Sequence, residues 1–128
     1  MTSIPNLSLL QVPKLVGEAV AAHVRSVRRG VLFASALDAG CGTGLAGPHL
    51  RPLVTGTLAG VDLSQKMLER AALLRREDGV DGPVYDMLRA RDLETLHTAD
   101  VLPPRDVAQG LGVELVTAAD VLVYFGDL

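Results

Sequence analysis

The stretch LDAGCGTG at residues 37–44, followed by AGVDLS at residues 59–64, decides the fold of this chain. An apolar run, VLFASAL at residues 31–37, leads into the first stretch, and a second run, TLAGVDL at residues 57–63, overlaps the other. Glycines in such a turn let the backbone approach a ligand closely, and a carboxylate after the second run can accept both hydroxyls of a ribose. The pattern is typical of a site for a nucleotide-type cofactor.

Composition bounds the class of protein. The chain has 128 residues, of which 48% are hydrophobic and 3% aromatic, and its net charge is −3. This length is typical of one domain, and the apolar content suffices for a single core built mainly from Leu, Val and Ala. The charge gives no basic face for nucleic acid. Neither a secretory signal nor an apolar run of roughly 18 residues is present, so we expect a cytoplasmic protein without a membrane span.

Cysteine and histidine usage argues against disulfide and metal chemistry. Cys41 is the single cysteine, so no intramolecular disulfide can form and no oxidising compartment is required. His23, His49 and His97 are scattered along the sequence without partners at ligand spacing. We therefore expect no metal site.

The first half of the chain alternates between helical and extended patterns. Apolar positions at helical spacing predict a helix over residues 13–29, begun by Pro13 and stopped near Gly30. The apolar run at residues 31–37 predicts a central parallel strand buried on both faces, and the run at residues 57–63 predicts a second strand. A short helix limited by Pro52 is expected between them.

The second half continues this alternation. Ser64 is expected to cap a helix that runs from residue 65 to about residue 76. Residues 84–96 are ambiguous and can hold a short third strand ending near Asp92, with a polar connection behind it. Residues 113–125 contain two apolar runs split at Asp120, which predict a fourth strand followed by a loop or helix start. The order favours an α/β fold with right-handed crossovers and a parallel sheet.

The glycine-rich stretch resembles the class I S-adenosylmethionine-dependent methyltransferases. Their acid-x-Gly-x-Gly-x-Gly motif stands here as Asp38, Gly40, Gly42 and Gly44. The resemblance implies a Rossmann-like three-layer α/β/α fold and S-adenosylmethionine as the cofactor. It covers about residues 31–128, the cofactor-binding half of a seven-stranded family domain. It thus implies a single incomplete domain over residues 1–128, truncated after about four strands.

The resemblance also implies roles for individual residues. Asp62 would accept the ribose diol, Asp92 would accept a hydrogen bond from the adenine amino group, and Asp120 would lie beside the methionine end of the cofactor. The residues expected to bind the cofactor are Asp38, Gly40, Cys41, Gly42, Thr43, Gly44, Asp62, Leu63, Met67, Asp92, Leu93 and Asp120.

Several of these residues also have a plainer interpretation. Asp62 could cap the following helix in competition with Ser64, and apolar residues such as Met67 are more often core. Asp92 could be a solvated surface acid, because such charges are mostly exposed. Arg91 beside it departs from the small residue that is usual in the family. For Cys41 the family favours packing near the cofactor over a role as nucleophile.

A narrower resemblance lies at the C-terminal end. AADVLVYFGDL, residues 118–128, is similar to the fourth-strand region of methyltransferase domains in bacterial and algal proteins, often those with tetratricopeptide repeats. No such repeat occurs in this sequence. Tyr124 would lie near the acceptor mouth, and Asp120 or Tyr124 is the only suggestion for a general base. No catalytic residue is assigned.

Other functions remain open at the level of sequence. Gly42, Gly44 and Gly47 also spell G-x-G-x-x-G, with Asp62 twenty residues beyond the first of them, which is the fingerprint of a nicotinamide-dependent oxidoreductase. The acid two residues before Gly40 fits the methyltransferase pattern better. The turn could also serve only to pack a helix on a strand, or the chain could be an inactive fragment that acts as a binding module. The partners expected are S-adenosylmethionine or S-adenosylhomocysteine and an unidentified methyl acceptor, and the oligomeric state stays open.

Overall fold

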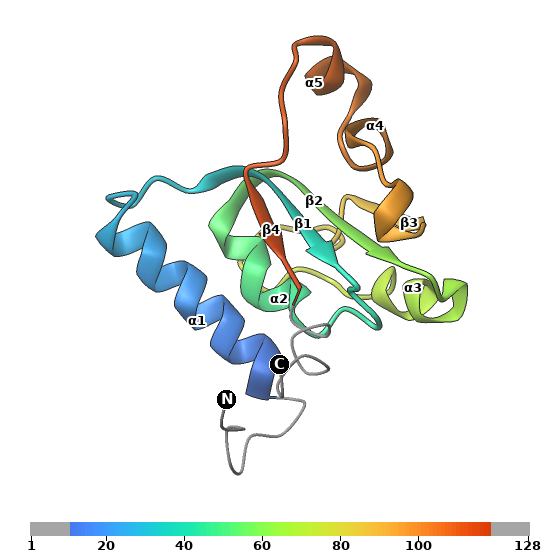
Figure 1. Cartoon of the computed structure of the whole chain (residues 1–128). Coiled ribbons are helices and arrows are strands. Elements are labelled where there is room, and N and C mark those ends of the chain that lie inside the picture. The colour runs from blue at the N-terminus through green and yellow to red at the C-terminus, as the bar shows by residue number, and fades with distance from the viewer. Residues whose placement is uncertain (1–10, 119–128) are drawn as a thin grey trace, which may run out of the picture.

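The computed structural model describes residues 11–118, and its centre is one parallel sheet (Figure 1). The strand order is β3-β2-β1-β4, with β1 at Phe33–Ala39, β2 at Val54–Asp62, β3 at Met87–Ala90 and β4 at Leu115–Thr117. The helices are α1 (Gln11–Ser26), α2 (Gly47–Leu50), α3 (Gln65–Ala71), α4 (Thr98–Val101) and α5 (Pro104–Ala108), with single 3-10 turns η1 (Arg51–Leu53) and η2 (Leu93–Thr95). The expected α/β fold with a parallel sheet is confirmed.

Apolar side chains pack on both faces of the sheet. Successive residues of a strand point to opposite faces, so Ala36 and Leu58 belong to one buried cluster and Leu37 and Ala59 to the other. The first cluster is completed by side chains of α1, α2 and α3, and the second by Val101 of α4. The three-layer arrangement is therefore confirmed, and burial on both faces explains why the strands read as continuous apolar runs.

Two helices differ in extent from the sequence prediction. α1 already includes Gln11 and Val12, which precede the predicted first residue Pro13. α1 ends at Ser26 instead of residue 29, because Gly30 adopts a positive φ of 84° and donates its N–H to the carbonyl of Val24 at 2.8 Å. α3 ends at Ala71 instead of residue 76, and the chain then turns back into an antiparallel bridge at Arg75. The polar connection expected after β3 contains the short helices α4 and α5.

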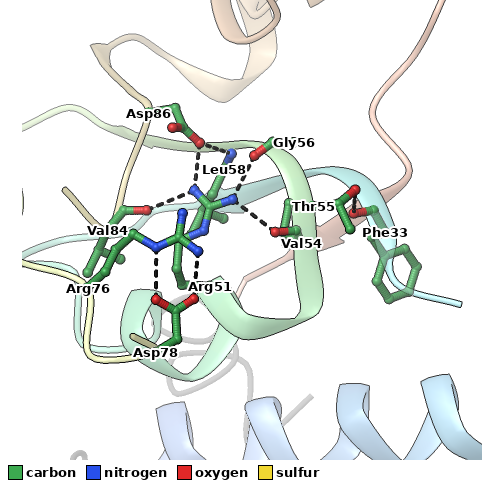
Figure 2. A network of polar contacts seen from close by, with 10 residues as sticks. All are labelled: Phe33, Arg51, Val54, Thr55, Gly56, Leu58, Arg76, Asp78, Val84 and Asp86. Carbon is green, nitrogen blue, oxygen red and sulfur yellow. Dashed lines mark hydrogen bonds and ion pairs between the residues drawn. The ribbon is translucent and has the colours of Figure 1, made fainter. Parts of the chain in front are cut away.

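A buried arginine joins the start of β2 to the segment that precedes β3 (Figure 2). Arg51 is only 3% exposed, and its guanidinium donates to the carbonyls of Val84 (3.1 Å), Val54 (3.0 Å) and Gly56 (2.6 Å). It also donates to the carboxylate of Asp86 at 2.6 Å, which accepts a backbone N–H of β2 at 2.8 Å. These contacts anchor the amino end of β2.

A second ion pair lies beside this arginine. Arg76 donates to both carboxylate oxygens of Asp78, at 2.9 and 2.6 Å (Figure 2). The hydrogen bond from Arg76 is the main reason why the pKa of Asp78 falls from 3.8 to about 2, and the same contact raises the pKa of Arg76. The pair therefore stays ionised well into the acid range.

Candidate functional site

The glycine-rich turn leaves β1 at the carboxyl edge of the sheet, where ligands bind in open α/β folds. Gly40, Gly42 and Gly44 have positive φ angles of 66°, 57° and 90°, which side chains strongly disfavour. The N–H of Cys41 donates to the carbonyl of Val61 at 3.0 Å, so the turn is tied to β2. The structure thus places the predicted residues 38–44 at the end of β1 and in the loop that leads to α2.

Asp62 ends β2 and lies against this turn. Its Oδ2 accepts the N–H of Gly42 and its Oδ1 accepts the N–H of Ser64, both at 2.9 Å. The cap of α3 is Ser64 itself, whose hydroxyl oxygen accepts the N–H of Met67 at 3.3 Å. An ionised carboxylate has about four lone-pair sites. One on each oxygen of Asp62 therefore remains for further donors.

Asp38 lies beneath the turn. It is 2% exposed, and its Oδ2 accepts the hydroxyl hydrogen of Tyr85 at 2.6 Å. Tyr85 is itself buried and comes from the segment between α3 and β3. Tyr85 is not among the residues that the sequence predicts for the site. The available signal was an aromatic residue in a connecting segment of a chain with only two tyrosines.

The end of β3 adjoins the end of β2. Ala90 pairs in register with Asp62, so Asp92 follows at the same edge of the sheet. Asp92 is exposed, and its Oδ1 accepts the N–H of Glu94 at 3.0 Å at the start of η2. It is a surface acid with a local capping contact, placed beside the strand that carries Asp62.

Apolar side chains around these strand ends are not buried. Leu63, Met67 and Leu93 are 76%, 45% and 44% exposed. The interpretation of Leu63 and Met67 as core residues therefore does not hold, because neither belongs to the buried clusters on the two faces of the sheet.

The remaining predicted residues fall into two groups. Cys41 is 3% exposed with its thiol directed at the carbonyl of Gly42 (3.7 Å), a position that agrees with packing, and Thr43 is half-buried in the turn. Asp120 and Tyr124 lie outside the described residues. Within residues 11–118 no group of three or more His, Cys, Asp or Glu side chains could hold a metal ion. No helix in that same range is both long and apolar enough to cross a bilayer.

A glycine turn after β1 and an acid at the end of β2, on an open parallel sheet, are typical of nucleotide-type cofactor domains of the α/β class. The sequence profile of a methyltransferase domain matches residues 36–102, which is more than half of the chain. The chain belongs to this methyltransferase domain family.

Several solved structures are similar to this chain. An S-adenosylmethionine-dependent methyltransferase from Clostridium acetobutylicum ATCC 824 is 26% identical, with 73% of this chain and 34% of that chain covered and a TM-score of 0.50. An S-adenosylmethionine-bound amino pentose methyltransferase from Micromonospora echinaspora is 24% identical (73% and 34% covered, TM-score 0.47). Magnesium protoporphyrin IX methyltransferase from Synechocystis PCC 6803, with bound S-adenosylhomocysteine, is 22% identical (69% and 37% covered, TM-score 0.47).

This chain matches only part of each of these proteins. The chain spans about a third of the length of the methyltransferases to which it is similar. No curated protein sequence matches it significantly.

Proposed function

We propose that this chain forms the S-adenosylmethionine-binding part of a methyltransferase whose acceptor is still to be identified. The observation that carries the proposal is the carboxylate of Asp62. The N–H groups of Gly42 and Ser64, each at 2.9 Å, orient it at the end of β2, and a lone pair on each oxygen remains for a ligand. Two such acceptors side by side suit the two hydroxyls of one ribose.

The apolar side chains beside Asp62 support a ligand with a flat ring. Leu63, Met67 and Leu93 follow β2 and β3 and are 76%, 45% and 44% exposed. Covering such side chains with an adenine ring removes apolar surface from water, which is favourable. Asp92, next to Leu93, is exposed and available to accept a hydrogen bond from the adenine amino group.

The start of α2 favours a ligand without phosphate groups. A dinucleotide places its pyrophosphate on free N–H groups at a helix start. Here the N–H of Gly47 donates to the carbonyl of Gly44 and that of His49 to the carbonyl of Ala46, each at 3.0 Å, while Pro48 has no N–H. The N–H groups at the start of α2 are therefore either bonded within the protein or missing, and α2 itself spans only Gly47–Leu50. S-adenosylmethionine carries no phosphate, so it needs no such donors.

The chemistry expected of the domain is mainly one of positioning. When bound, S-adenosylmethionine supplies an electrophilic methyl group on a sulfonium sulfur. Asp62 orients the ribose, the glycine turn allows close approach of the backbone, and the apolar side chains cover the adenine. Holding reactants in line supplies much of the rate of such a displacement. Proton removal from an acceptor is not assigned to any residue of the chain.

Calorimetric titration of the chain with S-adenosylhomocysteine tests the proposal. We expect saturable binding by the wild type and an affinity at least about tenfold lower for Asp62→Ala, because hydrogen bonds to a charged group are lost. Circular dichroism shows whether the variant keeps its fold. Asp81→Asn is the matched control, since it removes a fully exposed carboxylate that pairs with Arg75.

Two results would contradict the proposal. Equal affinity of wild type and Asp62→Ala would remove Asp62 from the site. A folded chain that binds NADH and does not bind S-adenosylhomocysteine would favour the oxidoreductase alternative instead.

A further inference from the structure

The ring of Tyr85 occupies space that three glycines leave open. A Cβ atom at Gly47 would lie 2.7–2.8 Å from three atoms of this side chain, which are its nearest neighbours. One at Gly44 or Gly60 would lie 3.0 or 3.1 Å from the ring, with Leu74 (2.7 Å) or Leu88 (2.8 Å) closer still. Cβ atoms essentially never approach other heavy atoms within 3.0 Å. The three glycines come from the turn, α2 and β2, so three separate segments make room for one aromatic ring.

The hydroxyl of Tyr85 fixes the other end of the ring. It donates to Oδ2 of Asp38 at 2.6 Å, a length typical of a hydrogen bond to a carboxylate. Asp38 is the last but one residue of β1, two positions before Gly40 of the glycine turn, and it is 2% exposed. Tyr85 is 4% exposed, so water does not compete for this contact. The ring is thus held between the turn and the strand that precedes it.

We propose that Tyr85 is a positioning residue for the cofactor: from beneath the glycine turn it sets the turn's shape, and through that shape it sets the affinity for S-adenosylmethionine. The turn must hold Gly42 where its N–H donates to the carboxylate of Asp62. Tyr85 contacts Asp38 before Gly42 and lies against Gly44 after it, so it limits how far the turn can move. This inference rests on the proposed function, but the fit between ring and glycines is measurable without any ligand.

The first test is the affinity of Tyr85→Phe for S-adenosylhomocysteine. This variant keeps the ring and loses the hydroxyl, so we expect an unchanged circular dichroism spectrum. We expect an affinity roughly tenfold lower, because only a fraction of the molecules then holds the turn in its binding shape. Val84→Ala is the control for a purely structural effect, because Val84 is fully buried next to Tyr85. It should lower the thermal midpoint and leave the affinity unchanged. Wild-type affinity in Tyr85→Phe would overturn the proposal.

The second test needs no ligand. Gly47 has no positive φ, so an alanine there causes no backbone strain of that kind. The cost of Gly47→Ala should come from steric overlap with neighbouring atoms, of which those of Tyr85 are the nearest. We expect Gly47→Ala to lower the urea midpoint of unfolding in the wild-type background and to lower it much less in Tyr85→Leu, where the ring is gone. Equal effects in both backgrounds would overturn the steric part of the proposal. If the wild type binds no S-adenosylhomocysteine, the proposed function fails, while this cycle still decides whether the ring shapes the turn.

Discussion

At the scale of single residues, two aspartates of the same chemistry serve different purposes because their surroundings differ. Asp38 is buried and bound by the hydroxyl of Tyr85, so it acts within the protein. Asp62 is half-buried, and its partners are two backbone N–H groups, which orient it without using all of its lone pairs. In the sequence, both acids come at the end of an apolar run. Only their contacts in the structure distinguish Asp38, which binds another side chain, from Asp62, the candidate ligand-binding acid.

Gly44→Ala tests the crowding at the turn. Gly44 has φ +90°, and a Cβ there would lie 2.7 Å from Leu74 and 3.2 Å from Ala71. Gly79 is the matched control, because it has φ +88° with nothing within 4 Å. The left-handed backbone costs each alanine variant about 1–2 kcal/mol, and the clash should cost Gly44→Ala about 1–3 kcal/mol more. Urea unfolding measures both, and equal losses would mean that the packed side chains move aside freely.

At the scale of elements, Arg51 determines how β2 begins. The residue lies in η1, close before the strand (Figure 2). Its guanidinium donates to two carbonyls in the first three residues of β2, and to the Val84 carbonyl and the Asp86 carboxylate from the segment before β3. The planar group with its several N–H donors satisfies these acceptors at once, which no other side chain can do. A charged residue is buried here because it extends the connection between β2 and the segment before β3 beyond the residues that pair in the sheet.

The substitution Arg51→Met measures how much the contacts of Arg51 contribute to the free energy of unfolding. The variant keeps much of the apolar volume and leaves the carbonyls of Val84 and Val54 without their donor, so we expect a loss of about 2–4 kcal/mol in unfolding free energy. Arg51→Lys should recover only part of it. Arg75→Met, which breaks an exposed pair, should cost less than about 1 kcal/mol. A stable Arg51→Met protein would show that water replaces the guanidinium.

At the scale of the whole molecule, the central strands are buried on both faces, so the helical layers on the two sides depend on one sheet. Leu58 of β2 belongs to the cluster beneath α1, α2 and α3, whereas Val61 belongs to the cluster covered by α4. Both side chains are 0% exposed. The two clusters should therefore be lost together when the sheet unfolds.

Truncation on either face should destabilise the same transition. We expect Leu58→Ala to cost about 2–5 kcal/mol and Val61→Ala somewhat less, because fewer methyl groups are removed. Each variant should show a single urea transition when followed both by circular dichroism and by tyrosine fluorescence. Transitions that separate between the two probes would show that the faces unfold independently. The control is Glu69→Ala on α3, whose side chain is exposed.

The sequence by itself determined the features that depend on local pattern. Continuous apolar runs predicted the central strands, Ser64 predicted the start of α3, and the glycines with Asp62 predicted a cofactor-type turn at the sheet edge. These follow from short-range rules of burial, capping and backbone freedom. The roles of Asp120 and Tyr124 stay predictions, because both lie outside the described residues.

Only the tertiary structure decided which distant residues meet. Tyr85 reaches Asp38 across 47 positions, and Arg51 reaches Val84 across 33 positions. It also decided that Leu63 and Met67 are exposed and that α3 stops early, where the chain bends back at Arg75. The physical reason is that the local periodicity of a sequence indicates only which face of a helix or strand is apolar. Contacts between remote segments depend on how the packed layers bring these faces, and their few polar groups, together.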